Sequence, residues 1–198
     1  MKQEESIHLE RCPHCSVAKP NLVSMTRFQT QNASGRIRRI WACYFCKTCG
    51  GVLLTAAFPD GKSQYTEIID MWPTPTAVDA AVPGRAKQYL EQAISSVHAP
   101  SGAVMLAASS VDAMLKEKGL KQGNLYGRIN EAAKQHLITE EMATWAHEVR
   151  LDANDERHAD EEAELPSTGD AERVIEFTLA LAQFLFVLPS RVERGRRK

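Results

Sequence analysis

Two short cysteine motifs constrain this chain more than any other feature. Cys12 and Cys15 form one C-x2-C pair, Cys46 and Cys49 form a second, and thirty residues separate the pairs. Each pair offers two thiolates to one side of a tetrahedron, and two pairs close it, which is the ligand arrangement that Zn²⁺ prefers. Two glycines follow the second pair and let the backbone turn tightly, so that its amides can approach the sulfurs. The sequence therefore predicts a zinc site held by these four cysteines.

The predicted zinc has a structural role, because a site closed by four thiolates keeps no open position for water. Cys43 and His14 are alternative ligands, but either would break the symmetry of the two pairs. We expect Cys43 to be a buried strand residue and His14 to face solvent. An odd number of cysteines, five, fits metal ligation in a reducing compartment better than a disulfide framework.

Segments with strand character surround the cysteine pairs and are separated by turn residues. They are 22–30, 36–44, 52–58 and 64–72. This pattern predicts that residues 1–72 form a zinc ribbon of short antiparallel strands.

Three arginines and three aromatic residues follow the first turn of the predicted ribbon: Arg36, Arg38, Arg39, Trp41, Tyr44 and Phe45. On one interpretation, the arginines and Trp41 grip the backbone of RNA or DNA and stack its bases. On the other, the aromatic residues pack around the zinc and the arginines are simply solvated. The second interpretation is favoured, because residues 1–72 carry only nine basic residues against six acidic ones.

The periodicity changes in the second half of the chain. Pro73 and Pro75 predict a linker over residues 73–82, since prolines so close together neither join a sheet nor continue a helix. Apolar residues then recur at helical spacing, which predicts a helical bundle over residues 83–190. Pro189 is expected to end its last helix, leaving 191–198 as a basic tail that either touches phosphates or, as is commoner, is solvated and disordered. The predicted fold class is α+β.

The segment from Trp145 to His158 gathers acid, base and amide side chains. In an uninterrupted helix His147, Asn154 and His158 would lie within about 20° of one line, with Arg150 about 60° away and the apolar face opposite. Such a face is normally exposed to solvent. Alternatively the helix breaks between residues 152 and 155, which favour caps and turns, and directs His158 inward.

Together with the two cysteine pairs, several short motifs of the second half resemble the domain of unknown function family 4145, over roughly residues 10–190. They are Glu91-Gln-Ala93, the run from Met114 to Gly119, Val149-Arg150-x-x-Ala153-Asn154-x-x-x-His158, and a final helix ending in Leu188-Pro189. That family is similar in turn to the HEPN superfamily of helical bundles, which occur in bacterial toxins and phage defence and include metal-independent ribonucleases. The resemblance implies a catalytic Arg and His, paired across a homodimer, at Arg150 and His158, with Asn154 in the same motif.

Two functions of different class follow. In a ribonuclease or toxin component, His158 would move a proton at a ribose hydroxyl while Arg150 held the phosphate. However, the acidic run through Glu164 would repel RNA unless its carboxylates point away or bind a divalent cation. The favoured alternative is a non-catalytic interaction module that dimerises or recruits partners within a nucleic-acid-directed defence system. In it, Arg150 would form a structural ion pair and hydrogen bonds with His158, Asn154 or nearby carboxylates.

No segment approaches the roughly 18 uninterrupted apolar residues of a membrane helix, and the first residues lack the apolar core of a signal peptide. We therefore expect a soluble, cytoplasmic protein without a membrane partner. The nearly all-round apolar final helix and the family resemblance both favour a homodimer.

Overall fold

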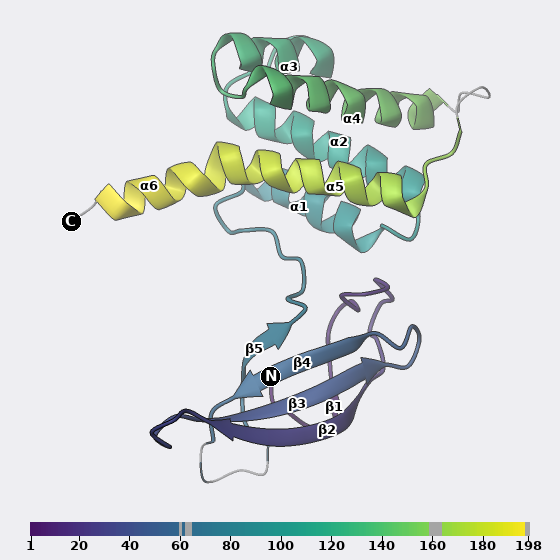
Figure 1. Ribbon diagram of the computed structural model, residues 1–198. Helices are drawn as coiled ribbons and strands as arrows, with labels where there is room; N and C mark the ends of the chain where they lie inside the picture. Colours follow the sequence, from purple (N-terminus) through teal and green to yellow (C-terminus); the bar gives the residue numbers. More distant parts are fainter. Residues whose placement is uncertain (60, 62–64, 159–163, 197–198) are drawn as a thin grey trace. The chain divides into compact units, whose positions relative to one another are not determined.

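The computed structural model describes residues 1–59, 61, 65–158 and 164–196, and for residues 154–158 it describes the backbone but not the side chains. The chain divides into two compact units, Met1–Thr76 and Ala77–Lys198. The first contains the strands and the second the helices (Figure 1). The predicted α+β class, with a small β unit followed by a helical bundle, is confirmed.

The first unit is an antiparallel sheet whose described strands lie in sequence order. They are β1 (Ser6–Ile7), β2 (Leu22–Gln31), β3 (Arg38–Cys46), β4 (Val52–Ala57) and β5 (Ile68–Trp72). The four predicted strands match β2 to β5, although residue 64 lies outside the described residues. The two-residue β1 was not predicted, because so short a segment has no periodicity of its own.

Strand alternation separates the two faces of the sheet. On β3, Ala42, Tyr44 and Cys46 are fully buried and pack with Leu22 and Leu53 in the core of this unit. Successive side chains of a strand point to opposite faces. The residues between them on β3 therefore belong to the outer face, and the core of this unit lies on one side of the sheet only.

The predicted linker is shorter than expected. The boundary between the two units follows Thr76, and Val78 and Val82 are buried in the core of the helical unit. The prolines at positions 73 and 75 do mark the end of the sheet, but the apolar residues after them gain more by packing against helices than by remaining in water.

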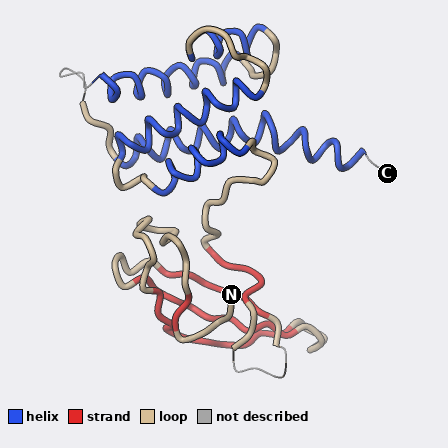
Figure 2. The backbone as a smooth tube through the Cα atoms, turned by 180° about the vertical axis from the view of Figure 1, so that it is seen from behind, coloured by secondary structure: helices blue, strands red, loops and turns tan. Residues whose placement is uncertain are grey.

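The second unit is all helical (Figure 2). Its helices are α1 (Gly84–Ser95), α2 (Pro100–Glu117), α3 (Leu125–Lys134), α4 (Glu140–His158), α5 (Thr168–Ala182) and α6 (Leu188–Arg196), with a π-helix at Gln183–Val187. Helix α2 packs against α1, α3, α4 and α5 and so lies at the centre of the bundle. Among the described residues, no helix has the length and apolar character needed to cross a bilayer.

Helix α4 runs unbroken from Glu140 to His158. Thr139 caps its start, because its hydroxyl accepts a hydrogen bond from the Met142 amide at 3.2 Å. The alternative in which the helix breaks after Arg150 is wrong for the backbone. Where the side chains of Asn154 and His158 point lies outside the described residues.

The last helix does not stop at Pro189, contrary to prediction. A π-helix immediately precedes α6, and the Leu188 amide donates to the Gln183 carbonyl five residues earlier. In an α-helix a proline ring collides with the carbonyl four residues before it, and the wider π turn before Pro189 makes room for that ring. Residues 191–196 are consequently an exposed helix and not a disordered tail, while 197 and 198 lie outside the described residues.

Candidate functional site

The four predicted metal ligands converge in the first unit. The Sγ atoms of Cys12, Cys15, Cys46 and Cys49 all lie within 4.8 Å of one another. Cys12 and Cys46 are buried in the core of the sheet unit, whereas Cys49 is exposed. The cluster thus joins the end of β3 to the loop after β1 and could hold a metal ion.

The sulfur geometry fits a tetrahedral ion. A Zn–S bond of about 2.3 Å requires the sulfurs to be about 3.8 Å apart, and Cys12 Sγ lies 3.9 Å from Cys49 Sγ. Backbone amides also approach the sulfurs, His14 N at 3.4 Å from Cys12 Sγ and Gly51 N at 3.4 Å from Cys49 Sγ. The donor set therefore suits a thiophilic cation, with amides that stabilise negative charge on the sulfurs.

The pKa values of the cluster thiols are shifted in opposite directions. Burial raises the pKa of Cys12. Burial also acts to raise the pKa of Cys46, but hydrogen bonds from the backbone of Cys49 and Thr48 and from neighbouring thiols outweigh it and lower this pKa to about 7. Cys46 is therefore the ligand most readily available as the thiolate that a metal requires.

Cys43 and His14, the two alternative ligands, do not belong to the cysteine cluster. Cys43 lies on β3 outside the cluster and is half-buried. His14 is exposed, and its Nε2 lies 2.8 Å from the Val52 carbonyl. Its ring covers Gly51 so closely that a Cβ there would lie 2.5 Å from it. Gly51 is thus required by the imidazole above it, while Gly50, with φ of 73°, makes the turn.

The predicted nucleic-acid residues do not surround the cysteine cluster. Arg36 and Arg38 are exposed at the start of β3, and Arg39 and Trp41 are half-buried on its outer face. Tyr44 is fully buried in the core. The expectation that all three aromatic residues pack around the zinc is therefore wrong for Trp41, which contacts Phe28 and Trp72 instead.

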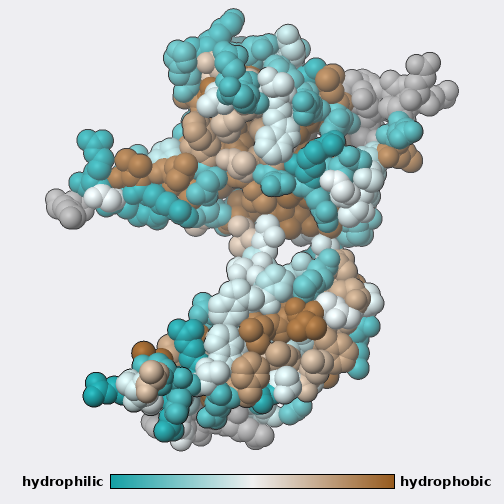
Figure 3. Space-filling model, viewed as in Figure 1, coloured by the Kyte–Doolittle hydropathy of each residue, from teal (hydrophilic) through white to brown (hydrophobic). Residues whose placement is uncertain are grey.

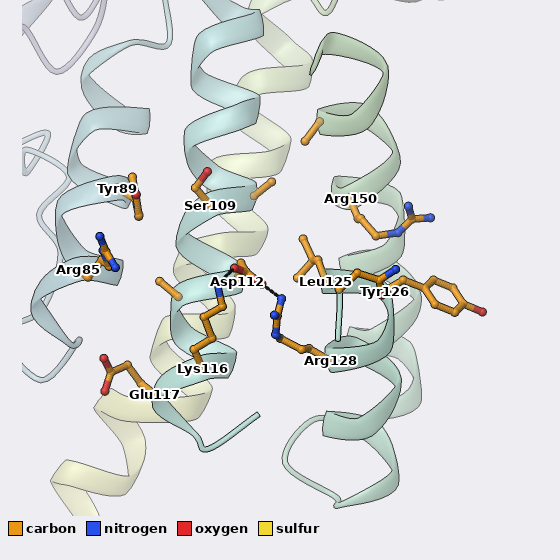
Figure 4. Close-up of a pocket in the computed structure, with 14 residues that line it drawn as sticks. Arg85, Tyr89, Ser109, Asp112, Lys116, Glu117, Leu125, Tyr126, Arg128 and Arg150 are labelled. Atoms are coloured by element: carbon orange, nitrogen blue, oxygen red, sulfur yellow. Dashed lines mark hydrogen bonds and ion pairs between the residues drawn. The ribbon is translucent and has the colours of Figure 1, made fainter. Parts of the chain in front are cut away.

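A cleft of about 600 Å³ opens in the helical unit. Its basic lining residues are Arg85, Lys116, Arg128 and Arg150, and its acidic ones are Asp112 and Glu117. Asp112 is already engaged, because its carboxylate lies 2.6 Å from Arg128 Nη1 and 2.5 Å from Lys116 Nζ (Figure 4). Basic groups exceed acidic groups in the lining, so the cleft favours an anion.

Arg150 lies at the edge of this cleft beside Tyr126, with Arg85 and Tyr89 of α1 on the opposite side (Figure 4). Its guanidinium carbon is 5.4 Å from the centre of the Tyr126 ring, and its Nε is buried without a hydrogen-bond partner among the described residues. Among the described side chains no carboxylate forms a salt bridge with it. The expected contacts of Arg150 with Asn154 and His158 lie outside those side chains.

His147 was expected on an exposed face, but it packs against α3. Its ring centre is 4.7 Å from that of Tyr126, and its Nε2 is 3.2 Å from Asn130 Oδ1. Burial, and then the charge of Arg150, lower the pKa of His147. His147 thus packs against the Tyr126 ring, and that ring in turn lies beside the Arg150 guanidinium.

Sequence patterns gave no signal for Arg85, Asp112, Tyr126 and Arg128. These residues come from three different helices. In the sequence, each occupies what looks like an ordinary solvent-facing position of an amphipathic helix. The other two predicted catalytic residues, Asn154 and His158, follow Arg150 on α4, but their side chains are outside the described residues.

Comparison with curated proteins and with solved structures found no match to the chain. The model of one protein family, described as Domain of unknown function (DUF4145), matches residues 91–198. These residues include most of the helical unit with Arg150, whereas the sheet and the cysteine cluster lie outside the match. Because the match spans more than half of the chain, this protein belongs to the DUF4145 family.

Proposed function

We propose that this protein is a non-catalytic interaction module that binds nucleic acid through phosphate contacts in the cleft of its helical unit. The four cysteines of the sheet unit hold a structural Zn²⁺ ion in this proposal. The cellular setting that we propose is bacterial or phage defence, possible protein partners included, and it rests on the resemblance to HEPN proteins alone.

The zinc proposal is supported by the sulfur positions and by the absence of any non-cysteine ligand in the described cluster. When bound, Zn²⁺ supplies charge neutralisation for four thiolates and a rigid link between two loops. The chain's own contribution is to bury Cys12 and Cys46 and to direct backbone amides at the sulfurs.

The observation that carries the nucleic-acid proposal is the environment of Arg150. Its guanidinium lies over Tyr126 at a cleft with excess basic lining, and no described carboxylate neutralises it. A guanidinium presents a planar set of donors that matches two phosphate oxygens. Arg85 lies across the cleft from Arg150 and is exposed, so it provides a second cation for another phosphate of the same strand (Figure 4).

A ribonuclease that uses Arg150 and His158 is the second candidate. It is favoured by the position of Arg150 at a basic cleft and by the continuous helix that carries both residues. In that reaction His158 would accept the proton of a ribose 2′-hydroxyl, and Arg150 would stabilise charge on the phosphate.

One experiment tests the phosphate site. We expect zinc-loaded protein to bind labelled 20-nucleotide RNA and DNA, with affinity that falls as salt rises. Arg150→Gln and Arg85→Gln should each weaken binding, whereas Lys134→Gln, an exposed basic residue of the same unit outside the cleft, should not. Equal binding by all four proteins would refute the phosphate role of the cleft.

The same samples separate the two candidates. Incubation of RNA without added divalent cation should leave it intact if the protein is a binding module. Cleavage that leaves 2′,3′-cyclic phosphate ends, and that Arg150→Ala and His158→Ala both abolish, would instead establish the ribonuclease.

A further inference from the structure

Three aromatic side chains form a row across the outer face of the N-terminal sheet. Phe28 on β2 lies opposite Trp41 on β3 in the strand register, with ring centres 6.3 Å apart and planes inclined by 13°. The Trp72 ring of β5 lies 5.8 Å from that of Trp41. We call Phe28, Trp41 and Trp72 the aromatic row.

The aromatic row is held in place from below and from the side. Ala56 of β4 is opposite Trp41 and is fully buried, and its small side chain leaves room for the two indole rings to meet across that strand. The Trp41 Nε1 donates a 2.8 Å hydrogen bond to Thr30 Oγ1. The ring positions are therefore fixed in advance, which lowers the entropy that a ligand must offset on binding.

The row nevertheless remains open to solvent. Phe28 is 45 % exposed and Trp72 is 43 % exposed. Figure 3 shows hydrophobic side chains at the surface over the strands of this unit. Aromatic side chains with fixed positions are normally covered by the rest of the protein. A row of rings that is fixed but open to solvent is therefore suited to contact with another flat ring system.

Cations adjoin the aromatic row along β3. Arg39 lies two residues before Trp41 and hence on the same face, with its guanidinium carbon 5.8 Å from the Phe58 ring centre. At the other end of the strand the Lys47 ammonium is 4.6 Å from the Phe45 ring centre. Arg39 and Phe45 are separated by about 20 Å along an extended strand, which is room for several nucleotides between the two basic ends.

This combination identifies the class of ligand. Flat apolar rings in the middle with cations at both ends match a polymer of flat bases joined by anionic phosphates. A duplex hides its bases, so the complementary ligand is single-stranded. Asp70 is paired with Ala56 in the register and so shares this face, where its carboxylate opposes phosphate binding.

We propose that the outer face of the N-terminal sheet is a stacking platform for single-stranded nucleic acid, in which bases stack on Phe28 and Trp72, and Arg39 and Lys47 contact the flanking phosphates. The choice of nucleic acid as partner rests on the proposed function, but the platform itself is independent of the cleft that contains Arg150.

Tryptophan fluorescence of the full-length, zinc-loaded protein provides the test. Two of the three tryptophans lie in the aromatic row, and the third, Trp145, packs against Phe177 in the helical unit. We expect twelve-nucleotide oligo(dT) and oligo(U) to quench the fluorescence to saturation, and the matching duplexes to quench it far less. Quenching by either single strand supports the platform, and the tighter one identifies DNA or RNA as the source.

Substitutions then locate the binding. Trp72→Leu and Phe28→Leu should each weaken single-strand binding roughly tenfold, the loss expected for one stacked base. Arg39→Gln should weaken it and reduce its salt dependence, while Asp70→Asn should strengthen it. Leu165→Ala is the control, since Leu165 is 82 % exposed but lies in the helical unit and outside the cleft.

Two results would overturn the platform. One is the absence of saturable quenching by any single strand. The other is unchanged affinity in Trp72→Leu and Phe28→Leu when circular dichroism shows both to be folded. Loss of binding in Arg150→Gln alone would support the cleft and refute the platform, whereas loss in the row variants alone would do the reverse.

Discussion

At Cys46, burial and hydrogen bonding act on the thiol in opposite directions. Burial would keep it protonated, but the amides of Thr48 and Cys49 and the neighbouring thiols lower its pKa to about 7. Cys43 lies only three residues earlier on the same strand, yet it is outside the cysteine cluster. Position relative to the cluster, and not the thiol group alone, therefore decides which cysteine could bind a metal ion.

This difference predicts a pair of variants with opposite outcomes. Cys46→Ser should lose bound zinc and the ordered sheet, because three thiolates leave the ion incompletely coordinated. Cys43→Ser should keep one zinc per chain. Metal content by mass spectrometry of native protein measures both, and a zinc-loaded Cys46→Ser protein would contradict the four-cysteine site.

The sequence was informative about residues whose partners are near in the chain. The cysteine ligands could be predicted because each pair is itself a local motif. The surroundings of Arg150 could not, since Arg85 and Tyr126 reach it from separate helices. His147 was expected to be exposed for the same reason: helical periodicity identifies the face it occupies on α4, but not that α3 covers this face.

At the scale of elements, the start of α5 is fixed by a reciprocal cap. The Asp170 amide donates to Ser167 Oγ at 3.2 Å, and the Ser167 amide donates to Asp170 Oδ2 at 2.9 Å. The hydrogen bonds from Ser167 lower the pKa of Asp170. Such a cap is encoded locally, since a Ser and an Asp three residues apart lie within one turn.

The cap makes stability depend on pH. Because the Asp170 pKa is lower in the folded state, its contribution is present above the unfolded value of 3.8 and is lost as pH falls through the folded value. Ser167→Ala should destabilise the helical unit by about 1 kcal/mol at pH 7. Urea denaturation should show a smaller difference between the two proteins at pH 2, and an undiminished difference would contradict the role of the carboxylate.

The end of the same helix could not be predicted. Pro189 reads as a stop signal because proline cannot donate the backbone hydrogen bond of an α-helix. Whether a π turn forms before it depends on how Leu185 and Val187 pack in the bundle core, which no local pattern encodes. The extended α6 and its exposed side chains are consequences of that packing.

At the scale of the whole molecule, exposed apolar residues of the π-helix and α6 predict self-association. Phe184, Leu188 and Val192 recur every four residues and are 41 %, 44 % and 58 % exposed. We expect a homodimer, formed by this stripe against the stripe of a second copy. Light scattering at micromolar concentration should give twice the 22.0 kDa mass of one chain.

Val192→Asp should convert the dimer to a monomer, because it introduces a charge into an apolar contact. Arg194→Gln, on the same helix but outside the stripe, should leave the dimer intact. A wild-type mass near 22.0 kDa would contradict the dimer outright.

The π turn also sets the direction in which that stripe faces around the helix axis. In a π-helix each backbone hydrogen bond joins residues five apart, whereas in an α-helix it joins residues four apart. The π turn therefore contains one extra residue, and one residue corresponds to a rotation of about 100°. The helix axis thus continues past Val187 while its faces are offset, so that Val192 is not in phase with the core face of α5. Deleting a single residue within 183–187 would cancel this phase shift: the turn could close with α-helical hydrogen bonds, and the side chains of α6 would keep their directions.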